Sequence, residues 1–132
     1  MERTSTAFIV DHEIPQLTKT AFMPIRSDER NAIHNDDYAK EFGMRGALIG
    51  GSTLLSYVLE MLYNAFGKNW FYHGKIKASF IGGGAINGDV LTAHGLITAS
   101  EPVEAGTQMT LDVWMENQKQ EKIVVGTASC IL

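Results

Sequence analysis

Residues 52–66, STLLSYVLEMLYNAF, carry the most regular apolar pattern in the chain. Leu55, Leu59, Leu62 and Phe66 follow one another at spacings of four, three and four residues, which is the spacing of one face of an α-helix. Other apolar residues between them widen this face until it covers most of the circumference. A helix of this kind must be covered on most of its sides, so we expect it to lie at the centre of the fold.

Beyond Gly67, which we expect to end this helix, the sequence changes to short segments separated by glycine-rich or polar turns. Residues 111–116, LDVWME, alternate apolar with polar side chains, which is typical of an antiparallel strand with one face in water. We also expect a first strand at Leu17–Phe22. The other predicted strands are Phe71–Ile81, Asp89–Ser100, Thr107–Asn117 and Lys122–Leu132. One long buried helix and an antiparallel sheet predict an α+β fold, a single domain over residues 1–132 in which the sheet wraps around the helix.

The composition excludes several classes of function. With 11 Lys+Arg against 15 Asp+Glu the net charge is −4, and because no basic run is present we expect neither a nucleic-acid partner nor binding to an anionic membrane. No apolar run approaches the roughly 20 residues that span a bilayer, and residues 1–5 lack the apolar core of a signal peptide. We therefore expect a soluble, cytoplasmic protein. Its single cysteine, Cys130, excludes an internal disulfide and is expected as a small core residue.

Immediately before the helix, residues 27–52 read SDERNAIHNDDYAKEFGMRGALIGGS. This stretch places acidic residues and His34 upstream of a glycine pair that opens the helix. A carboxylate, an imidazole and free backbone N–H groups are what is needed to add or remove water beside a carbonyl. His34 by itself could equally be a surface or core imidazole, and Glu29 could belong to a solvated turn. For Gly51 we favour a functional role, because a glycine at a helix N-terminus leaves its N–H free to polarise a carbonyl oxygen.

The order of these residues resembles that of the MaoC-like dehydratases and (R)-specific enoyl-CoA hydratases of the hot-dog fold. The signature of that family runs D-x-N-P-(I/L)-H-x-D, then Y-A, then a glycine, then H-G at the start of the central helix. Weaker similarities continue toward the C-terminus, so that the resemblance covers the chain from roughly residue 14 onward. The matching residues are Asn31, Ile33, His34, Asp36, Tyr38, Ala39, Gly43 and Gly51, then Phe80, Gly88, Asp89, Asn117, Gln118, Val124, Gly126 and Ala128.

The resemblance implies a hydratase or dehydratase that acts on an enoyl or 3-hydroxyacyl thioester of CoA or of an acyl carrier protein, without a metal or redox cofactor. Glu29 and His34 would hold and deprotonate the attacking water, while the Gly51 N–H would bind the thioester carbonyl. Two positions depart from the signature: Glu29 stands where the family has its catalytic aspartate, with Asp28 one place earlier, and Gly50 stands where the family often has histidine. Asp28 and Gly50, together with the signature residue Asn31, are therefore further candidates.

Two other readings remain open. The altered carboxylate, and Ala32 in place of the proline of the signature, also fit a non-catalytic hot-dog subunit that binds an acyl ligand or stabilises a catalytic partner. An acyl thioesterase has weaker support. Because the 52–66 helix carries more apolar surface than one sheet can bury, we expect two protomers to join their sheets edge to edge. The dimer would be a homodimer, or a heterodimer with a related hot-dog chain if the subunit is non-catalytic.

Overall fold

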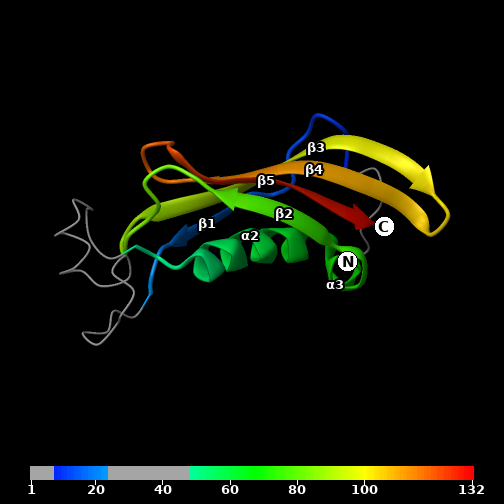
Figure 1. Ribbon diagram of the computed structural model, residues 1–132. Coiled ribbons are helices and arrows are strands. Elements are labelled where there is room, and N and C mark those ends of the chain that lie inside the picture. The colour runs from blue at the N-terminus through cyan, green and yellow to red at the C-terminus, as the bar shows by residue number, and fades with distance from the viewer. Residues whose placement is uncertain (1–7, 24–47) are drawn as a thin grey trace.

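The computed structural model describes residues 8–23 and 48–132. These residues form one antiparallel sheet in the order β1-β3-β4-β5-β2, and the helix α2 lies along one face of it (Figure 1). The elements are β1 (Leu17–Thr20), α2 (Gly51–Phe66), α3 (Lys68–His73), β2 (Lys75–Phe80), β3 (Val90–Val103), β4 (Gly106–Glu116) and β5 (Lys122–Ile131). The expected α+β class, with a curved sheet around one long helix, is confirmed. Within these ranges, no helix is long and apolar enough to cross a membrane.

The core lies between α2 and the concave face of the sheet. Val58, Met61 and Leu62 of the helix are fully buried, and burying each such side chain stabilises the fold by about 1.5–3 kcal/mol. From the sheet, Leu111 and alternate residues after it in β4 point at the helix, as the alternating pattern predicted. Cys130 is buried, as expected of a small core residue.

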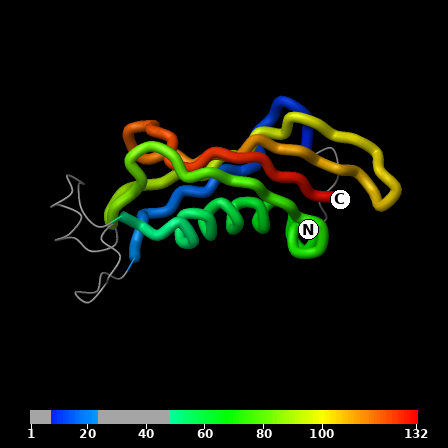
Figure 2. Tube along the Cα trace, in the orientation of Figure 1, coloured from blue at the N-terminus to red at the C-terminus, as the bar shows by residue number. Residues whose placement is uncertain are grey.

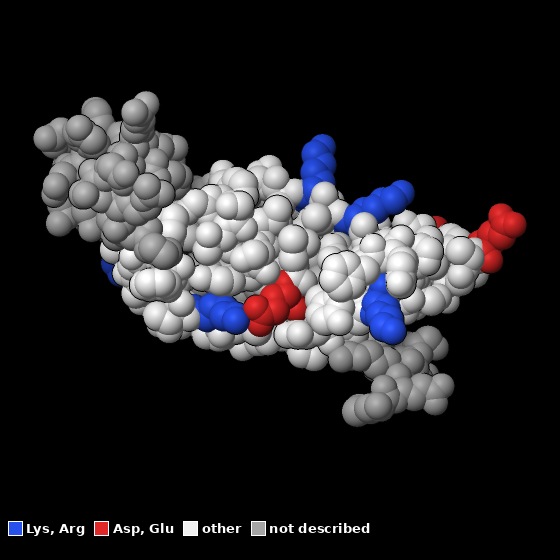
Figure 3. Space-filling view, turned by 90° about the horizontal axis from the view of Figure 1, so that it is seen from below, with Lys and Arg blue, Asp and Glu red and all other residues white. Residues whose placement is uncertain are grey.

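The opposite side of α2 is less well covered. Leu55 and Leu59 are only partly buried, and Tyr63 is 43% exposed. Seen from below, the side on which Figure 1 draws α2, charged side chains are separated by wide uncharged areas (Figure 3). The surplus of apolar surface expected from the sequence is therefore present on the described part of this face.

The expected strand Phe71–Ile81 is wrong over its first part, because residues 68–73 form the short helix α3. Gly67 ends α2 as predicted, with a left-handed φ of 63°, and its carbonyl accepts a hydrogen bond from Trp70 N at 3.0 Å. The N–H of Gly74 then donates to the carbonyl of Trp70 at 2.8 Å. A Cβ on Gly74 would lie 2.3 Å from that carbonyl oxygen, so only glycine permits this close turn. These local bonds outweigh the strand propensity of the aromatic residues between them.

Strand β3 continues to Val103, although residues 101 and 102 were expected in a loop. Pro102 pairs with Thr107 of β4, whose N–H and carbonyl both bond to Leu132 on its other side, at 3.0 and 2.8 Å. Pro102 therefore faces a partner that needs no N–H from it, and this is the position at which a strand tolerates proline. The resulting long β3–β4 hairpin extends past the end of the helix (Figure 2).

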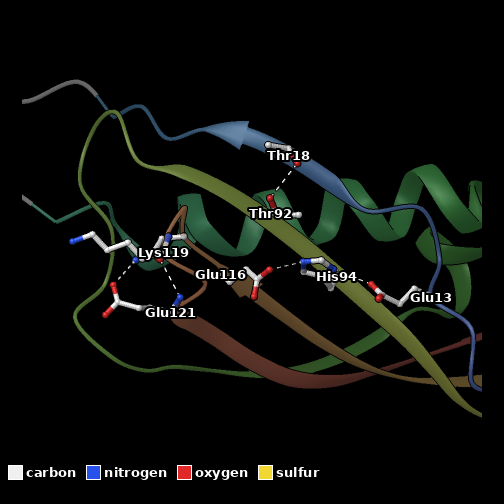
Figure 4. A network of polar contacts seen from close by, with 8 residues as sticks. Glu13, Thr18, Thr92, His94, Glu116, Lys119 and Glu121 are labelled. Carbon is white, nitrogen blue, oxygen red and sulfur yellow. Dashed lines mark hydrogen bonds and ion pairs between the residues drawn. The ribbon is translucent and has the colours of Figure 1, made fainter.

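The convex face of the sheet carries a polar cluster centred on His94 (Figure 4). Its Nδ1 lies 2.8 Å from Glu13 Oε1 and its Nε2 lies 3.0 Å from Glu116 Oε1, while its ring stacks on Trp114 with centroids 5.0 Å apart. Lys122 lies over the same indole ring, 5.3 Å from its centroid. These contacts join the segment before β1 to β3, β4 and β5, so the described surroundings of His94 give it a structural role.

Candidate functional site

The N-terminus of α2 opens onto an apolar cavity of about 410 Å³. None of the described residues that line it is charged, and the glycines of the 82–84 turn contribute backbone to its rim. The apolar walls are Leu48, Ile49, Leu54, Phe80, Ile81 and Ile123. A cavity with such walls suits an acyl chain or another apolar group.

The first turn of α2 has no side-chain cap. Gly50 stands at the N-cap with extended backbone (φ −62°, ψ 146°), and its carbonyl accepts hydrogen bonds from Thr53 N at 3.0 Å and Leu54 N at 3.2 Å. Among residues 8–23 and 48–132, no acceptor takes the N–H of Gly51 or of Ser52. Free N–H groups and the positive end of the helix dipole attract a negatively charged oxygen. The structure therefore places Gly51 at the rim of the cavity, in the first turn of α2.

Gly51 also permits a close approach between the helix and strand β2. A Cβ at this position would lie 3.0 Å from both Cε2 and Cζ of Phe80, closer than ordinary van der Waals contact. The Phe80 ring thus packs against Gly51 and forms part of the cavity wall at the helix N-terminus. Sequence analysis matched Phe80 to the family pattern but did not place it in the site. Its position two residues before the glycine triplet 82–84 was the available signal.

Segment 24–47 holds most of the sequence-predicted site. Glu29 and His34, with the further candidates Asp28 and Asn31, lie outside the described residues. The two residues that flank the segment in the structure, Met23 and Leu48, are described. Of the candidates, the structure describes only Gly51, which lines the cavity, and Gly50, which is the N-cap of α2.

Both ends of segment 24–47 are held at one turn, residues 85–89, beside this cavity. Met23 N donates to Asn87 Oδ1 at 2.7 Å, and Asn87 Nδ2 donates back to the carbonyl of Met23 at 2.9 Å. On the other side, Ile49 N donates to the carbonyl of Ala85 at 2.7 Å. Met23 and Ile49, on either side of segment 24–47, are therefore both bonded to the 85–89 turn.

The turn itself is stabilised by a buried carboxylate. Asp89 is 4% exposed, and its Oδ2 accepts a hydrogen bond from Ile86 N at 3.0 Å. Its Oδ1 accepts one from Gln118 Nε2, also at 3.0 Å. Asp89 and Gln118 were matched to the family pattern without a role, and the structure shows that they support the turn to which Met23 is tied.

A second hollow, of about 460 Å³, lies along the middle and C-terminal part of α2. Aromatic side chains, among them Tyr63, Trp70 and Phe71, form much of its wall. It contains neither the first turn of α2 nor the anchored ends of segment 24–47. The cavity at Gly51 is therefore the better candidate for chemistry.

No family model and no curated protein matches the sequence. Solved structures do. An (R)-hydratase from A. caviae involved in PHA biosynthesis has a TM-score of 0.68 at 20% identity, over 96% of this chain and 98% of that one. A MaoC-like dehydratase from Rhodospirillum rubrum has a TM-score of 0.71 at 14% identity, over 96% and 94%. The ChsH1-ChsH2 complex from Mycobacterium tuberculosis has a TM-score of 0.69 at 17% identity, over 94% and 98%.

A thioesterase superfamily member from Thermus thermophilus is less similar, with a TM-score of 0.59 at 9% identity over 94% of this chain and 82% of that one. All of these likenesses are at 20% identity or below, so they establish the fold. The chain has the hot-dog fold, and the resemblance to MaoC-like proteins is confirmed at the level of architecture.

Proposed function

We propose that this protein is a hydratase or dehydratase that adds water to, or removes it from, the β-carbon of an enoyl or 3-hydroxyacyl thioester. The observation that carries the proposal is the N–H of Gly51 at the rim of an apolar cavity, which no acceptor takes among the described residues, close to the bonded residues Met23 and Ile49 that flank segment 24–47. The structural likeness to an (R)-hydratase and a MaoC-like dehydratase supports this class of reaction.

Gly51 acts in this proposal as the donor to the thioester oxygen. When hydroxide adds to the β-carbon, the π electrons of the double bond move toward the carbonyl and negative charge builds on its oxygen. A backbone N–H at the positive end of a helix stabilises that charge without having to reorient. The apolar walls exclude competing water, which strengthens the interaction.

Glu29 and His34 supply the acid–base chemistry in this proposal. They take a proton from water as its oxygen bonds to the β-carbon, and a proton is then delivered to the α-carbon as the enolate collapses; dehydration is the reverse. An imidazole with an ordinary pKa of about 6.5 exchanges protons readily near neutrality. Loop closure supports the assignment, because only a short stretch separates Glu29 from Met23, which is tied to the turn at the cavity.

The cavity suits the acyl part of the substrate, while CoA or an acyl carrier protein is too large for it and remains outside. The test is direct: the purified protein is mixed with crotonyl-CoA, and the ultraviolet absorbance of the enoyl thioester is followed. Absorbance should fall as 3-hydroxybutyryl-CoA forms. A protein that is folded and leaves the absorbance unchanged contradicts the proposal.

We further propose that two protomers associate through their sheets. Strands β1 and β2 form the edges of the sheet, and Leu55, Leu59 and Tyr63 leave apolar surface on the nearby helix. Pairing of edge strands between two protomers buries such surface. It also provides hydrogen-bond partners for the backbone N–H and C=O groups of the edge strands, which otherwise favour aggregation. Sedimentation at micromolar concentration should give a dimer, and a fully active monomer contradicts the proposal.

A non-catalytic subunit is the second candidate. It is favoured by Glu29 and Gly50 in place of the aspartate and histidine of the family signature, and by the likeness to a chain from a complex of two named components. Such a subunit should bind butyryl-CoA without hydrating crotonyl-CoA, and activity should appear only with a related partner chain. A thioesterase would instead release free CoA, which a thiol reagent detects.

A further inference from the structure

Phe80 is the cavity wall closest to the group that would hold the thioester. It ends strand β2, and its backbone is fixed by pairing with the fully buried Val124. The next residue is fixed as well, since Ile81 N donates to the carbonyl of Ile123 at 2.9 Å. The Phe80 side chain is nevertheless 53% exposed, so its ring stands at the entrance of the cavity rather than in the core.

The distances around Gly51 show which substrate atoms this ring would meet. Two ring atoms lie 3.0 Å from the position of a Cβ on Gly51. Since N–Cα and Cα–Cβ bonds are each about 1.5 Å long, the ring edge is no more than about 6 Å from the Gly51 nitrogen. A carbonyl oxygen bonded to that nitrogen lies about 2.9 Å away, which puts its carbonyl carbon at about 4 Å and the α-carbon at about 5 Å. The edge of the Phe80 ring and the α-carbon of the bound thioester would therefore lie at similar distances from the Gly51 nitrogen.

The other described walls include Leu48, the glycine turn and Leu54, which lies about one turn further along α2. With the thioester oxygen on the Gly51 nitrogen, a substituent at the α-carbon falls within reach of the Phe80 ring. The backbone of Phe80 cannot retreat from it without breaking the pairing with β5.

We infer that Phe80 determines substrate specificity at this site by excluding acyl thioesters that carry a branch at the α-carbon. The inference rests on the proposed function, because it takes the Gly51 N–H as the donor to the thioester oxygen. The substrate class is accordingly that of straight-chain 2-enoyl thioesters. One methyl group in an apolar pocket changes selectivity by roughly 10- to 200-fold, which sets the size of the expected effect.

Turnover is measured with crotonyl-CoA and with 2-methylcrotonyl-CoA, which differ by one methyl group at the α-carbon. The wild-type protein should strongly prefer crotonyl-CoA, and Phe80→Ala should raise the ratio of kcat/KM for the branched over the straight substrate at least about tenfold. Phe80→Leu should give a smaller rise. Phe71→Ala is the matched control, because Phe71 is 75% exposed on α3 and lies outside this cavity; it should leave the ratio unchanged.

A measurement of binding affinity tests the role of Phe80 independently of the proposed reaction. Titration calorimetry with butyryl-CoA and 2-methylbutanoyl-CoA compares acyl groups that differ by the same α-methyl group, without chemistry. If the wild type has no hydratase activity but Phe80→Ala improves the relative affinity for the branched ligand about tenfold, the reaction is wrong and the role of Phe80 stands. If crotonyl-CoA is hydrated but both ratios stay the same in Phe80→Ala and Phe80→Leu, the role of Phe80 is overturned and the reaction stands. If neither ligand binds, both are overturned.

Discussion

The thioether sulfur of Met23 lies 3.4 Å from the backbone nitrogen of Gly50 and accepts its hydrogen bond. This contact joins the residue before segment 24–47 to the N-cap of α2. Together with the paired bonds between Met23 and Asn87, it fixes one end of that segment against the helix N-terminus. If Glu29 and His34 act as proposed, Met23 is the described residue nearest to them in the chain that is tied to the helix N-terminus.

Replacing Met23 should lower activity without unfolding the protein. Met23 is only partly buried, so Met23→Ala should have a small effect on stability. Because a displacement of about one ångström between reacting groups can cost on the order of a hundredfold, we expect kcat to fall by roughly ten- to a hundredfold, with a smaller change in KM. Steady-state kinetics with crotonyl-CoA measure this. Met23→Leu keeps the bulk and removes the acceptor, and equal activity of Met23→Leu and wild type would show that only packing matters.

The acid–base assignment predicts large losses at two positions. His34→Ala and Glu29→Gln should each lower kcat/KM by at least about a hundredfold, the scale expected for a positioned acid or base. Circular dichroism should show an unchanged fold. Asp28→Asn and Asn31→Ala are the neighbouring controls, with smaller expected losses. Inactivity of Asp28→Asn alone would move the carboxylate role one residue upstream.

A side chain at residue 51 should close the site. Gly51→Val should abolish turnover, because its Cβ would collide with the Phe80 ring at 3.0 Å and its methyl groups would cover the helix N-terminus. Gly83→Ala adds a methyl group to the same cavity rim where nothing lies within 4 Å, so its effect should be much smaller. A double-mutant cycle between Gly51→Ala and Phe80→Ala should show coupling, since removing the ring relieves the clash. Strict additivity of the two changes in stability would contradict the contact.

Cys130 should be inert in the folded protein. Burial raises the pKa of its thiol from 9.0 to about 11, so that at pH 8 only roughly one molecule in a thousand carries the reactive thiolate. A thiol reagent should react with it only after denaturation. Because the unfolded thiol ionises first, the stabilising contribution of the neutral thiol is complete below pH 9.0 and is lost as the pH rises toward about 11. Cys130→Ala should lack this part of the pH dependence of unfolding, and rapid labelling of the native protein at pH 8 would be inconsistent with burial.

The sequence by itself determined the elements whose burial follows a simple period. The spacing of Leu55, Leu59, Leu62 and Phe66 predicted the central helix to within one residue of its observed start, although its buried face is formed by Leu54, Val58, Met61, Leu62, Ala65 and Phe66. Alternation in residues 111–116 fixed a strand with one buried face. Gly67 marked the helix end, and the order of residues around His34 indicated both the hot-dog architecture and the class of reaction to test.

Only the tertiary structure decided how segments distant in the sequence meet. The close contact of Phe80 with Gly51, and the bonds of Met23 to Asn87 and Gly50, depend on strand register and on the packing of α2 against the sheet, which no local pattern encodes. The strand position of Pro102 has the same origin, whereas the helix at residues 68–73 is set by local bonds between Gly67, Trp70 and Gly74. In each, the hydrogen-bond partners available in the folded chain outweigh the intrinsic preference of the residues.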